Sequence, residues 1–178
     1  MKKGLILYRN SQLKPTYFRE LLLLAKYYAD GKTVPFSFAD HETSLHQQMS
    51  LWENIQLETG FRNWNEVLNH TKEHFPYLSQ IKMDLEKKVS DSTSFEIIFT
   101  SFLKAQFANN EVTIVEISDH LYTEKELKFL QKFFVDAGKN KKIYLRSTCP
   151  DSWENVADDV VEKHDHQFQS KKQIRSAA

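Results

Sequence analysis

Glycine is scarce in this sequence, which has only four among 178 residues. Average usage of roughly 7% would supply about three times as many. Loops that cradle phosphate rely on glycine, because a residue without a side chain lets successive backbone amides converge on one anion. The composition therefore disfavours a glycine-rich phosphate-binding loop.

Cysteine is nearly absent, and long apolar runs are missing. The single Cys149 excludes a disulfide within the chain and fits a reducing cytosol. No apolar run approaches the roughly 18 residues that a membrane-spanning helix needs. The apolar run that follows Met1 to Lys3 is too short for a signal peptide. We therefore expect a cytoplasmic protein that does not insert into a membrane.

An excess of charge of either sign is also missing. There are 24 basic and 24 acidic residues, so nothing draws the whole molecule to nucleic acid or to an anionic membrane. Lys171, Lys172 and Arg175 offer too few phosphate contacts to indicate nucleic-acid binding. At this length we expect one domain, residues 1–170, followed by a loose polar tail, residues 171–178.

What is present is a strong central strand. Residues 111–121 read EVTIVEISDHL, in which the run from Val112 to Val115 precedes Glu116. An apolar run without polar alternation is typical of a strand buried on both faces, as in a parallel sheet. An acid at the carboxyl end of such a strand stands where open α/β sheets bind their ligands. The stretch therefore suggests a nucleotide-binding fold.

Strands and helices alternate along the rest of the chain. Pro35 favours an edge position for the second strand. Thr123 and Glu126 form a capping box at a helix start, and Asp151 and Glu154 form a second capping arrangement. We expect strands at residues 4–8, 33–38, 142–146 and 160–161, and helices at residues 16–28, 95–107 and from Thr123 to Gly138.

A helical insertion separates the first strands from the central one. Residues 49–89 are mostly helical in pattern, and Tyr77, Ile81 and Leu85 continue at helical spacing after Pro76. The polar sequence from His164 onward is expected to be loose. The order of segments predicts a mostly parallel α/β sheet that carries a helical subdomain at about residues 50–93.

This order resembles the nucleotide-binding domain of ABC-type ATPases, from Gly4 to about Phe168. SFLKAQFANNEVTIVEISDHLYTEKELKFLQKFF is similar to the family's run from the helix after the signature loop through Walker B. KKIYLRSTCPDSWENVADDVV is similar to its H-loop strand and the segments that follow, and MSLWENI resembles the segment after its Q-loop. The resemblance implies a P-loop NTPase-like sheet flanked by helices, with a lost or reduced N-terminal β-subdomain.

The first motif of that family, Walker A, departs from its pattern G-x-x-x-x-G-K-[ST]. Lys14 falls on the phosphate lysine, and Thr16 lies beside the hydroxyl position. Both glycines are replaced, by Tyr8 and Leu13, and Pro15 removes an amide donor. Side chains at those two positions strain the loop and fill the phosphate space. We therefore treat Lys14 and Thr16 as vestigial and expect no nucleotide binding.

The second motif, Walker B, needs an Asp for magnesium and a following Glu for catalysis. Two alignments are open. Either Glu116 replaces the Asp and Ile117 replaces the Glu, or Val115 replaces the Asp and Glu116 is the catalytic acid. One of the two carboxylates is lost in both alignments, so Glu116 is a vestigial catalytic position.

The remaining motifs are altered as well. The switch histidine of the H-loop corresponds to Thr148, which is therefore vestigial too. The Q-loop glutamine corresponds to His41 or to Asp40, and the signature loop matches residues 90–95 without a glycine. His164 and the nearby His166 are too weak a pattern to predict a metal site. We expect no catalysis, no cofactor and no bound metal.

The resemblance nevertheless implies a partner, since ATPases of this family dimerise and dock their helical subdomain on a membrane protein. We interpret the chain as a non-catalytic interaction or regulatory subunit of a larger complex, in the cytoplasm or peripheral at the inner face of the membrane. Its partner is a second copy, an active paralogue, or a membrane or scaffold subunit. The candidate contacts, which also suit the subdomain's own core, are Trp52, Phe61, Trp64, Phe75 and Tyr77.

Two alternatives remain open. A weak or partner-completed ATPase subunit of an ABC-type transporter would use Lys14 and Glu116. A nucleic-acid or repair-associated ATPase relative is the other, which the balanced charge disfavours.

Overall fold

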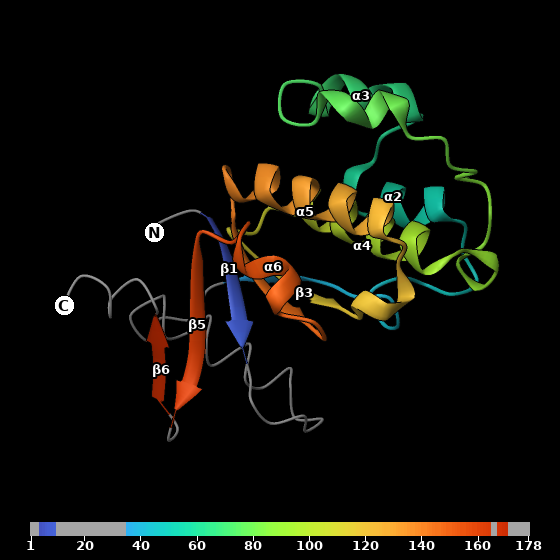
Figure 1. The fold of residues 1–178 in the computed structure, drawn as a ribbon. Helices are drawn as coiled ribbons and strands as arrows, with labels where there is room; N and C mark the ends of the chain where they lie inside the picture. Colours follow the sequence, from blue (N-terminus) through green and yellow to red (C-terminus); the bar gives the residue numbers. More distant parts are fainter. Residues whose placement is uncertain (1–3, 10–34, 165–166, 171–178) are drawn as a thin grey trace.

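The computed structural model describes residues 4–9, 35–164 and 167–170 of the chain (Figure 1). The helix expected at residues 16–28, the vestigial Lys14 and Thr16, and the tail at residues 171–178 lie outside the described residues. Among the described residues, no helix has the length and apolar character to cross a bilayer.

A single sheet organises the described part of the chain. Its order is β2-β3-β4-β1-β5-β6, in which the first five strands are parallel and β6 is antiparallel to β5. The mostly parallel sheet predicted from sequence is confirmed, and β2 occupies an edge as Pro35 predicted. The strands are β1 (Gly4–Arg9), β2 (Phe36–Ala39), β3 (Val112–Ile117), β4 (Lys142–Ser147), β5 (Asp159–His164) and β6 (Gln167–Ser170).

The prediction of a loose chain from His164 onward is wrong for residues 167–170. These residues pair with β5 in a hairpin, in the register Lys163 to Phe168. Strand pairing satisfies backbone groups whatever the side chains are, which explains why the polar composition of the segment did not reveal it.

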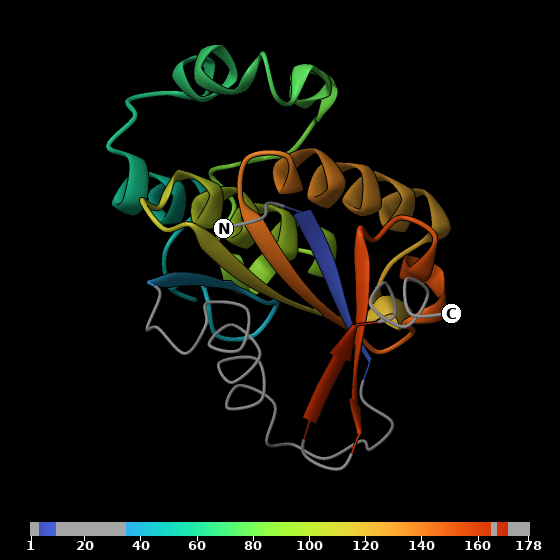
Figure 2. The same cartoon turned by 90° about the vertical axis from the view of Figure 1, so that its left-hand side faces the viewer.

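Two long helices cover one face of the sheet. Figures 1 and 2 show α4 and α5 side by side on that face, with α2 next to α4 and with α3 farther from the sheet. The helices are α2 (Leu51–Thr59), α3 (Trp64–Thr71), α4 (Ser94–Phe107), α5 (Glu124–Gly138) and α6 (Asp151–Glu154), and the 3-10 turns are η1 (Pro76–Gln80), η2 (Val89–Asp91) and η3 (Asp119–Leu121).

Side-chain caps fix where the longer helices begin. Thr123 accepts a bond from the Glu126 amide, and the Glu126 carboxylate accepts one from the Thr123 amide, so the predicted capping box is confirmed. The second predicted cap is wrong. Pro150 occupies the N-cap of α6 without a side-chain bond, and Asp151 is the first residue inside the helix. The Asp151 carboxylate pairs with the Arg9 guanidinium.

The main core lies between the sheet and the two long helices, and a smaller apolar cluster lies on the opposite face. Because side chains alternate along a strand, β1, β3 and β4 contribute to both. The main core includes Leu5, Leu7, Val115, Ile143, Leu145, Ile98, Phe102, Leu130, Phe133 and Phe134. The opposite cluster contains Ile6, Tyr8, Val112, Ile114, Tyr144 and Val161. The prediction that residues 112–115 are buried on both faces is confirmed.

The end of α5 lies directly on the backbone of β1. Gly138 is the last residue of α5, as predicted from sequence, and a Cβ there would be 3.0 Å from the Leu5 backbone nitrogen. Glycine is needed at this position for close packing of helix on strand, since no unusual backbone angle is involved.

The region predicted to be mostly helical divides into two parts. Helical turns continue to Gln80, and the chain then becomes extended and pairs with the start of α2, where the Trp52 amide donates to the Leu85 carbonyl at 2.8 Å. The helical interpretation of Ile81 and Leu85 is therefore wrong. Ile81, Met83 and Leu85 are half-buried while the residues between them are exposed, and this alternation is the period of a strand.

Candidate functional site

Parallel strands bring several charged residues to one edge of the sheet. We call this the carboxyl edge: the ends of β1, β3 and β4 with the following η3 and α6. Open α/β sheets bind their ligands outside this edge. Here it carries Arg9, Glu116 and Arg146 on three neighbouring strands.

Glu116 is held by an ion pair with Arg146. The two residues are register partners on β3 and β4, and Nη1 of Arg146 lies 2.5 Å from Oε1 of Glu116. Of the two side chains, that of Arg146 is 12% exposed and that of Glu116 is 32% exposed. The flanking Val115 and Ile117 are fully buried in the main core on the other face. In either alignment of this strand with Walker B, the acidic position that Glu116 does not fill is therefore a buried aliphatic side chain, Ile117 in one and Val115 in the other.

A second acid, Asp119 in η3, is buried and accepts bonds from five donors. Oδ2 accepts from the Ser147 hydroxyl, from Thr148 Oγ1 at 3.2 Å and from the Cys149 amide at 3.0 Å. Oδ1 accepts from Ser152 Oγ at 3.2 Å and from Trp153 Nε1 at 2.7 Å. Sequence reasoning missed this residue, because its donors lie about 30 positions away in the chain.

Thr148, the position of the switch histidine in the resemblance, joins two turns. Its hydroxyl accepts a bond from the Asp119 amide at 2.9 Å, and its own amide donates to the Ile117 carbonyl at 3.1 Å. The side chain therefore connects the end of β4 to the turn after β3.

Arg9 ends β1 and is surrounded by acids. Its guanidinium pairs with Asp151, and Nη1 lies 3.4 Å from Glu154 Oε1 and 3.7 Å from Glu162 Oε1. These contacts join β1 to α6 and β5. Tyr8, at the first glycine position of Walker A in the resemblance, is 1% exposed and belongs to the apolar cluster on the opposite face.

The loop after β2 is organised by Asp40. Its carboxylate accepts bonds from the backbone amides of Glu42, Thr43 and Ser44 and from the Thr43 hydroxyl. Burial on its own would raise the pKa of Asp40, but the bonds from Thr43 and Ser44 lower it below its ordinary value. The acid thus fixes the backbone of residues 42–44, which directly follow His41, the other candidate for the Q-loop glutamine.

The aromatic contact candidates are less exposed than a binding surface needs. Phe75 is 5% exposed and lies in the main core, so its side chain contacts the protein's own residues. Trp52, Phe61, Trp64 and Tyr77 are half-buried and pack against that core.

Tyr77 shows how contacts within the protein cover one of these aromatic side chains. Its hydroxyl donates to Asp136 Oδ2 at 3.0 Å, and its ring lies against Phe129. Burial and the Asp136 charge together raise the pKa of Tyr77 above its ordinary value. These contacts attach η1 to α5. Among the described residues, the exposed large apolar side chains are instead Leu57, at 57%, and Leu121, at 39%.

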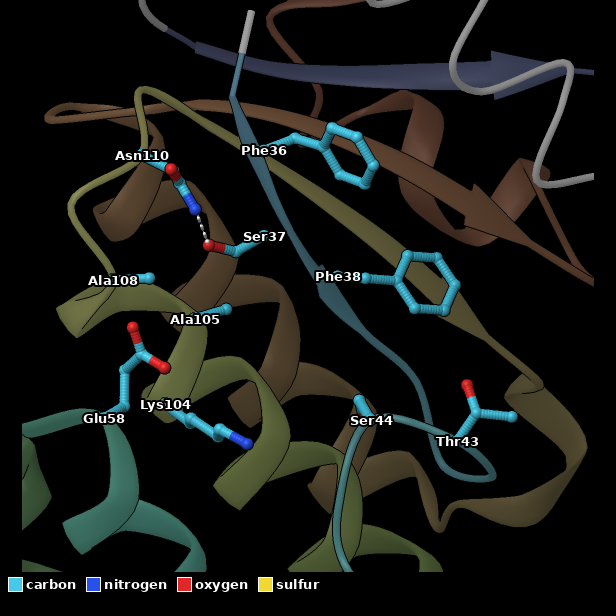
Figure 3. A pocket seen from close by; sticks show the side chains of 10 residues that line it. All are labelled: Phe36, Ser37, Phe38, Thr43, Ser44, Glu58, Lys104, Ala105, Ala108 and Asn110. Carbon is cyan, nitrogen blue, oxygen red and sulfur yellow. Dashed lines mark hydrogen bonds between the residues drawn. The ribbon is translucent and has the colours of Figure 1, made fainter.

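A pocket of about 370 Å³ lies beside the edge strand β2. Figure 3 shows it between β2, the end of α4 and the end of α2, with the Asn110 amide donating to Ser37 Oγ at 2.9 Å. No single stretch of sequence signals this pocket, since its lining comes from β2, the loop after β2, α2, and the end of α4 with the turn that follows. Its lining residues are Phe36, Ser37, Phe38, Thr43, Ser44, Glu58, Lys104, Ala105, Ala108 and Asn110.

Metal ligands do not cluster in the described part of the chain, where no group of three or more His, Cys, Asp or Glu side chains is placed to hold an ion. The thiol of Cys149 is exposed and unpaired with another cysteine.

Comparison with known proteins decides the fold. A solved structure of the ATP binding subunit of an ABC transporter superimposes with a TM-score of 0.65 and 12% sequence identity, covering 98% of this chain and 81% of that chain. The fold is ABC ATPase-like. No protein-family model and no curated protein sequence matches the chain.

The ABC ATPase-like fold agrees with the resemblance drawn from the sequence. At 12% identity the match carries the architecture alone. Similar structures number 604 chains, and a fold shared so widely does not specify an activity. The features of this protein that bear on its function are therefore the carboxyl edge and the surface.

Proposed function

We propose that this protein is a non-catalytic relative of the ABC ATPases, which acts through protein contacts as an interaction or regulatory subunit of a larger complex. The observation that carries the proposal is the ion pair between Glu116 and Arg146. This ion pair engages Glu116, which is the one acidic residue of β3 and lies on the strand face opposite the main core.

The chemistry of magnesium supports this proposal. Mg²⁺ takes oxygen ligands in near-octahedral geometry and is held in nucleotide sites by one or two carboxylates together with phosphate oxygens. A guanidinium at 2.5 Å from Glu116 Oε1 stands where such an ion would have to approach. The ion would have to displace the arginine or accept repulsion from its charge. Asp119 offers no substitute, because both its oxygens already accept bonds from the protein.

The phosphate side of the site supports the same conclusion. Tyr8 fills the first glycine position with a buried ring. Hydrolysis of ATP depends on positioning and charge stabilisation around the metal and the phosphates. With a carboxylate, a glycine and the switch histidine all replaced, we propose that nucleotide binding and hydrolysis are lost and that Lys14 and Thr16 are remnants.

The partner contact belongs, in this proposal, to the pocket beside β2. Six of its ten lining residues are polar or charged, and the other four are apolar, among them Phe36 and Phe38. This mixture of polar and apolar groups suits a bound protein segment. The exposed Leu57 directly precedes the lining residue Glu58. We propose that a protein subunit docks here. The similar solved structure is a subunit of an ABC transporter. This favours a partner that is attached to the membrane and exposes the docking surface to the cytoplasm, over a partner that is free in the cytoplasm.

A hydrolysis assay tests the loss of catalysis. We expect the native chain with Mg-ATP to release phosphate at the rate of a Glu116→Gln variant, which keeps the shape of the residue and removes its charge. A native rate clearly above the variant's would contradict the proposal and favour a weak ATPase. The same comparison is then made with a candidate membrane subunit added. A partner-completed ATPase would release phosphate above the rate of the Glu116→Gln variant only in this mixture.

A further inference from the structure

We infer that the carboxyl edge is held closed by the protein's own side chains, through a clasp centred on Asp119, and that it needs no ligand to stay ordered. The clasp consists of Asp119 and its five donor residues: Ser147, Thr148, Cys149, Ser152 and Trp153. The inference rests on the proposed function, since it supplies from within the chain what a nucleotide would otherwise provide.

The clasp joins segments that are far apart in sequence. Asp119 lies in η3 after β3, whereas its donors lie at the end of β4, in the following turn and in α6. The Asp119 amide also donates back to Thr148 Oγ1 at 2.9 Å. The bonds therefore run in both directions between the two turns and fix their relative position.

Burial makes the clasp costly to open. Asp119 is 6% exposed, and Trp153 is fully buried with its ring stacked on Phe134 at a centroid distance of 5.5 Å. If α6 moved away, a buried carboxylate would lose its donors and an indole would lose its packing. Opening therefore requires both changes at once.

Arg9 restrains α6 from its other side. Its pairs with Asp151 and Glu154 connect α6 to the end of β1, and its approach to Glu162 extends the connection to β5. Together with the Glu116–Arg146 pair, side-chain bonds then link the ends of four neighbouring strands: β3, β4, β1 and β5. The edge that would otherwise open to a ligand is closed by these links.

Asp119→Asn is a sharp test because the two side chains have the same shape. An amide has one oxygen, so in either orientation its NH₂ group faces a fixed N–H donor, either the Cys149 amide or Trp153 Nε1. A hydroxyl can turn its hydrogen away, but those two donors cannot. The matched control is Asp84→Asn in an exposed loop, where the carboxylate accepts from the Glu86 amide.

Hydrogen exchange measured by mass spectrometry gives the readout. In Asp119→Asn we expect amides at residues 147–154 and in η3 to exchange about tenfold faster or more, in keeping with the loss of a charged hydrogen bond. Asp84→Asn should exchange as the native chain does in those segments. Native-like exchange in Asp119→Asn would overturn the inference. Should that variant fail to fold, Trp153→Phe keeps the stacked ring while removing one donor, and unchanged exchange there would overturn it equally.

A parallel arm separates the two proposals. The native chain with and without millimolar Mg-ATP should show the same exchange along the carboxyl edge. Protection gained with Mg-ATP would contradict the proposed loss of nucleotide binding and also the claim that the edge needs no ligand. Suppose that Mg-ATP does not change the exchange and that Asp119→Asn exchanges as the native chain does. The clasp would then be contradicted, whereas the proposed loss of nucleotide binding would not.

Discussion

Charged side chains at the carboxyl edge face other parts of the protein. Glu116 pairs across the sheet with Arg146, Asp119 binds donors from α6, and Arg9 contacts acids on two elements. The Glu116–Arg146 pair is partly exposed to solvent, whereas Asp119 is 6% exposed and accepts bonds from five donors. A buried carboxylate is strongly destabilised by losing several donors. At the scale of single residues, Asp119 therefore matters more to this protein than Glu116.

Asp40 gives a prediction on the dependence of stability on pH. Its carboxylate is buried, and hydrogen bonds hold its pKa in the folded state below the ordinary value of 3.8. The unfolded chain therefore binds more protons between those two values. The stabilisation by Asp40 is complete above the ordinary value and is lost as pH falls through the lowered pKa.

Asp40→Asn should thus lower the free energy of unfolding by about 1–3 kcal/mol near neutral pH. The difference from the native chain should shrink on acidification. Urea unfolding of both chains, near neutral pH and below pH 3.8, measures it. Asp91→Asn, at an exposed position, serves as control. A difference that stays constant or grows in acid would contradict the role given to Asp40.

Residue types at the edge were readable from sequence, but their partners were not. From the sequence, Glu116 was placed at a strand end, and one of the two Walker B acids was found to be replaced. It does not reveal that Arg146, 30 positions later, is its register partner. Pairing across a parallel sheet depends on strand order, which local patterns do not encode.

Among the glycines that the structure describes, Gly138 brings its helix closest to a strand, at the contact between α5 and β1. Gly138→Ala would place a Cβ 3.0 Å from the Leu5 backbone nitrogen, which cannot rotate away as a side chain could. We expect the free energy of unfolding to fall by about 1–3 kcal/mol, the usual range for overpacking.

Denaturant unfolding of Gly138→Ala against Asn140→Ala measures this effect. Asn140 is exposed in the turn that follows α5, so its replacement should change stability little. Equal stability of the Gly138 variant and the native chain would show that α5 is free to shift, contrary to the packing described here.

Elements with strong local signals were predicted well, and weak ones were not. The apolar run of β3 and the capping box of α5 gave correct predictions. Residues 81–88 were taken for helix because Ile81 and Leu85 are four apart, although Met83 between them is also half-buried. Short apolar patterns fit both periods, and pairing with the start of α2 decides the outcome.

At the scale of the whole molecule, the order of segments predicted the architecture. The mostly parallel sheet and the ABC ATPase-like fold both agree with that order. The pocket beside β2 and the Asp119 clasp were out of reach, because each is assembled from segments distant in sequence. The architecture is ABC ATPase-like, and the charged groups at its carboxyl edge bind one another.

Under the proposed function the carboxyl edge does not bind a magnesium nucleotide, and isothermal titration calorimetry measures such binding without depending on hydrolysis. We predict no saturable heat when millimolar Mg-ATP is titrated into the native chain. Saturable heat near one ligand per chain that disappears in Lys14→Ala would contradict the proposed function.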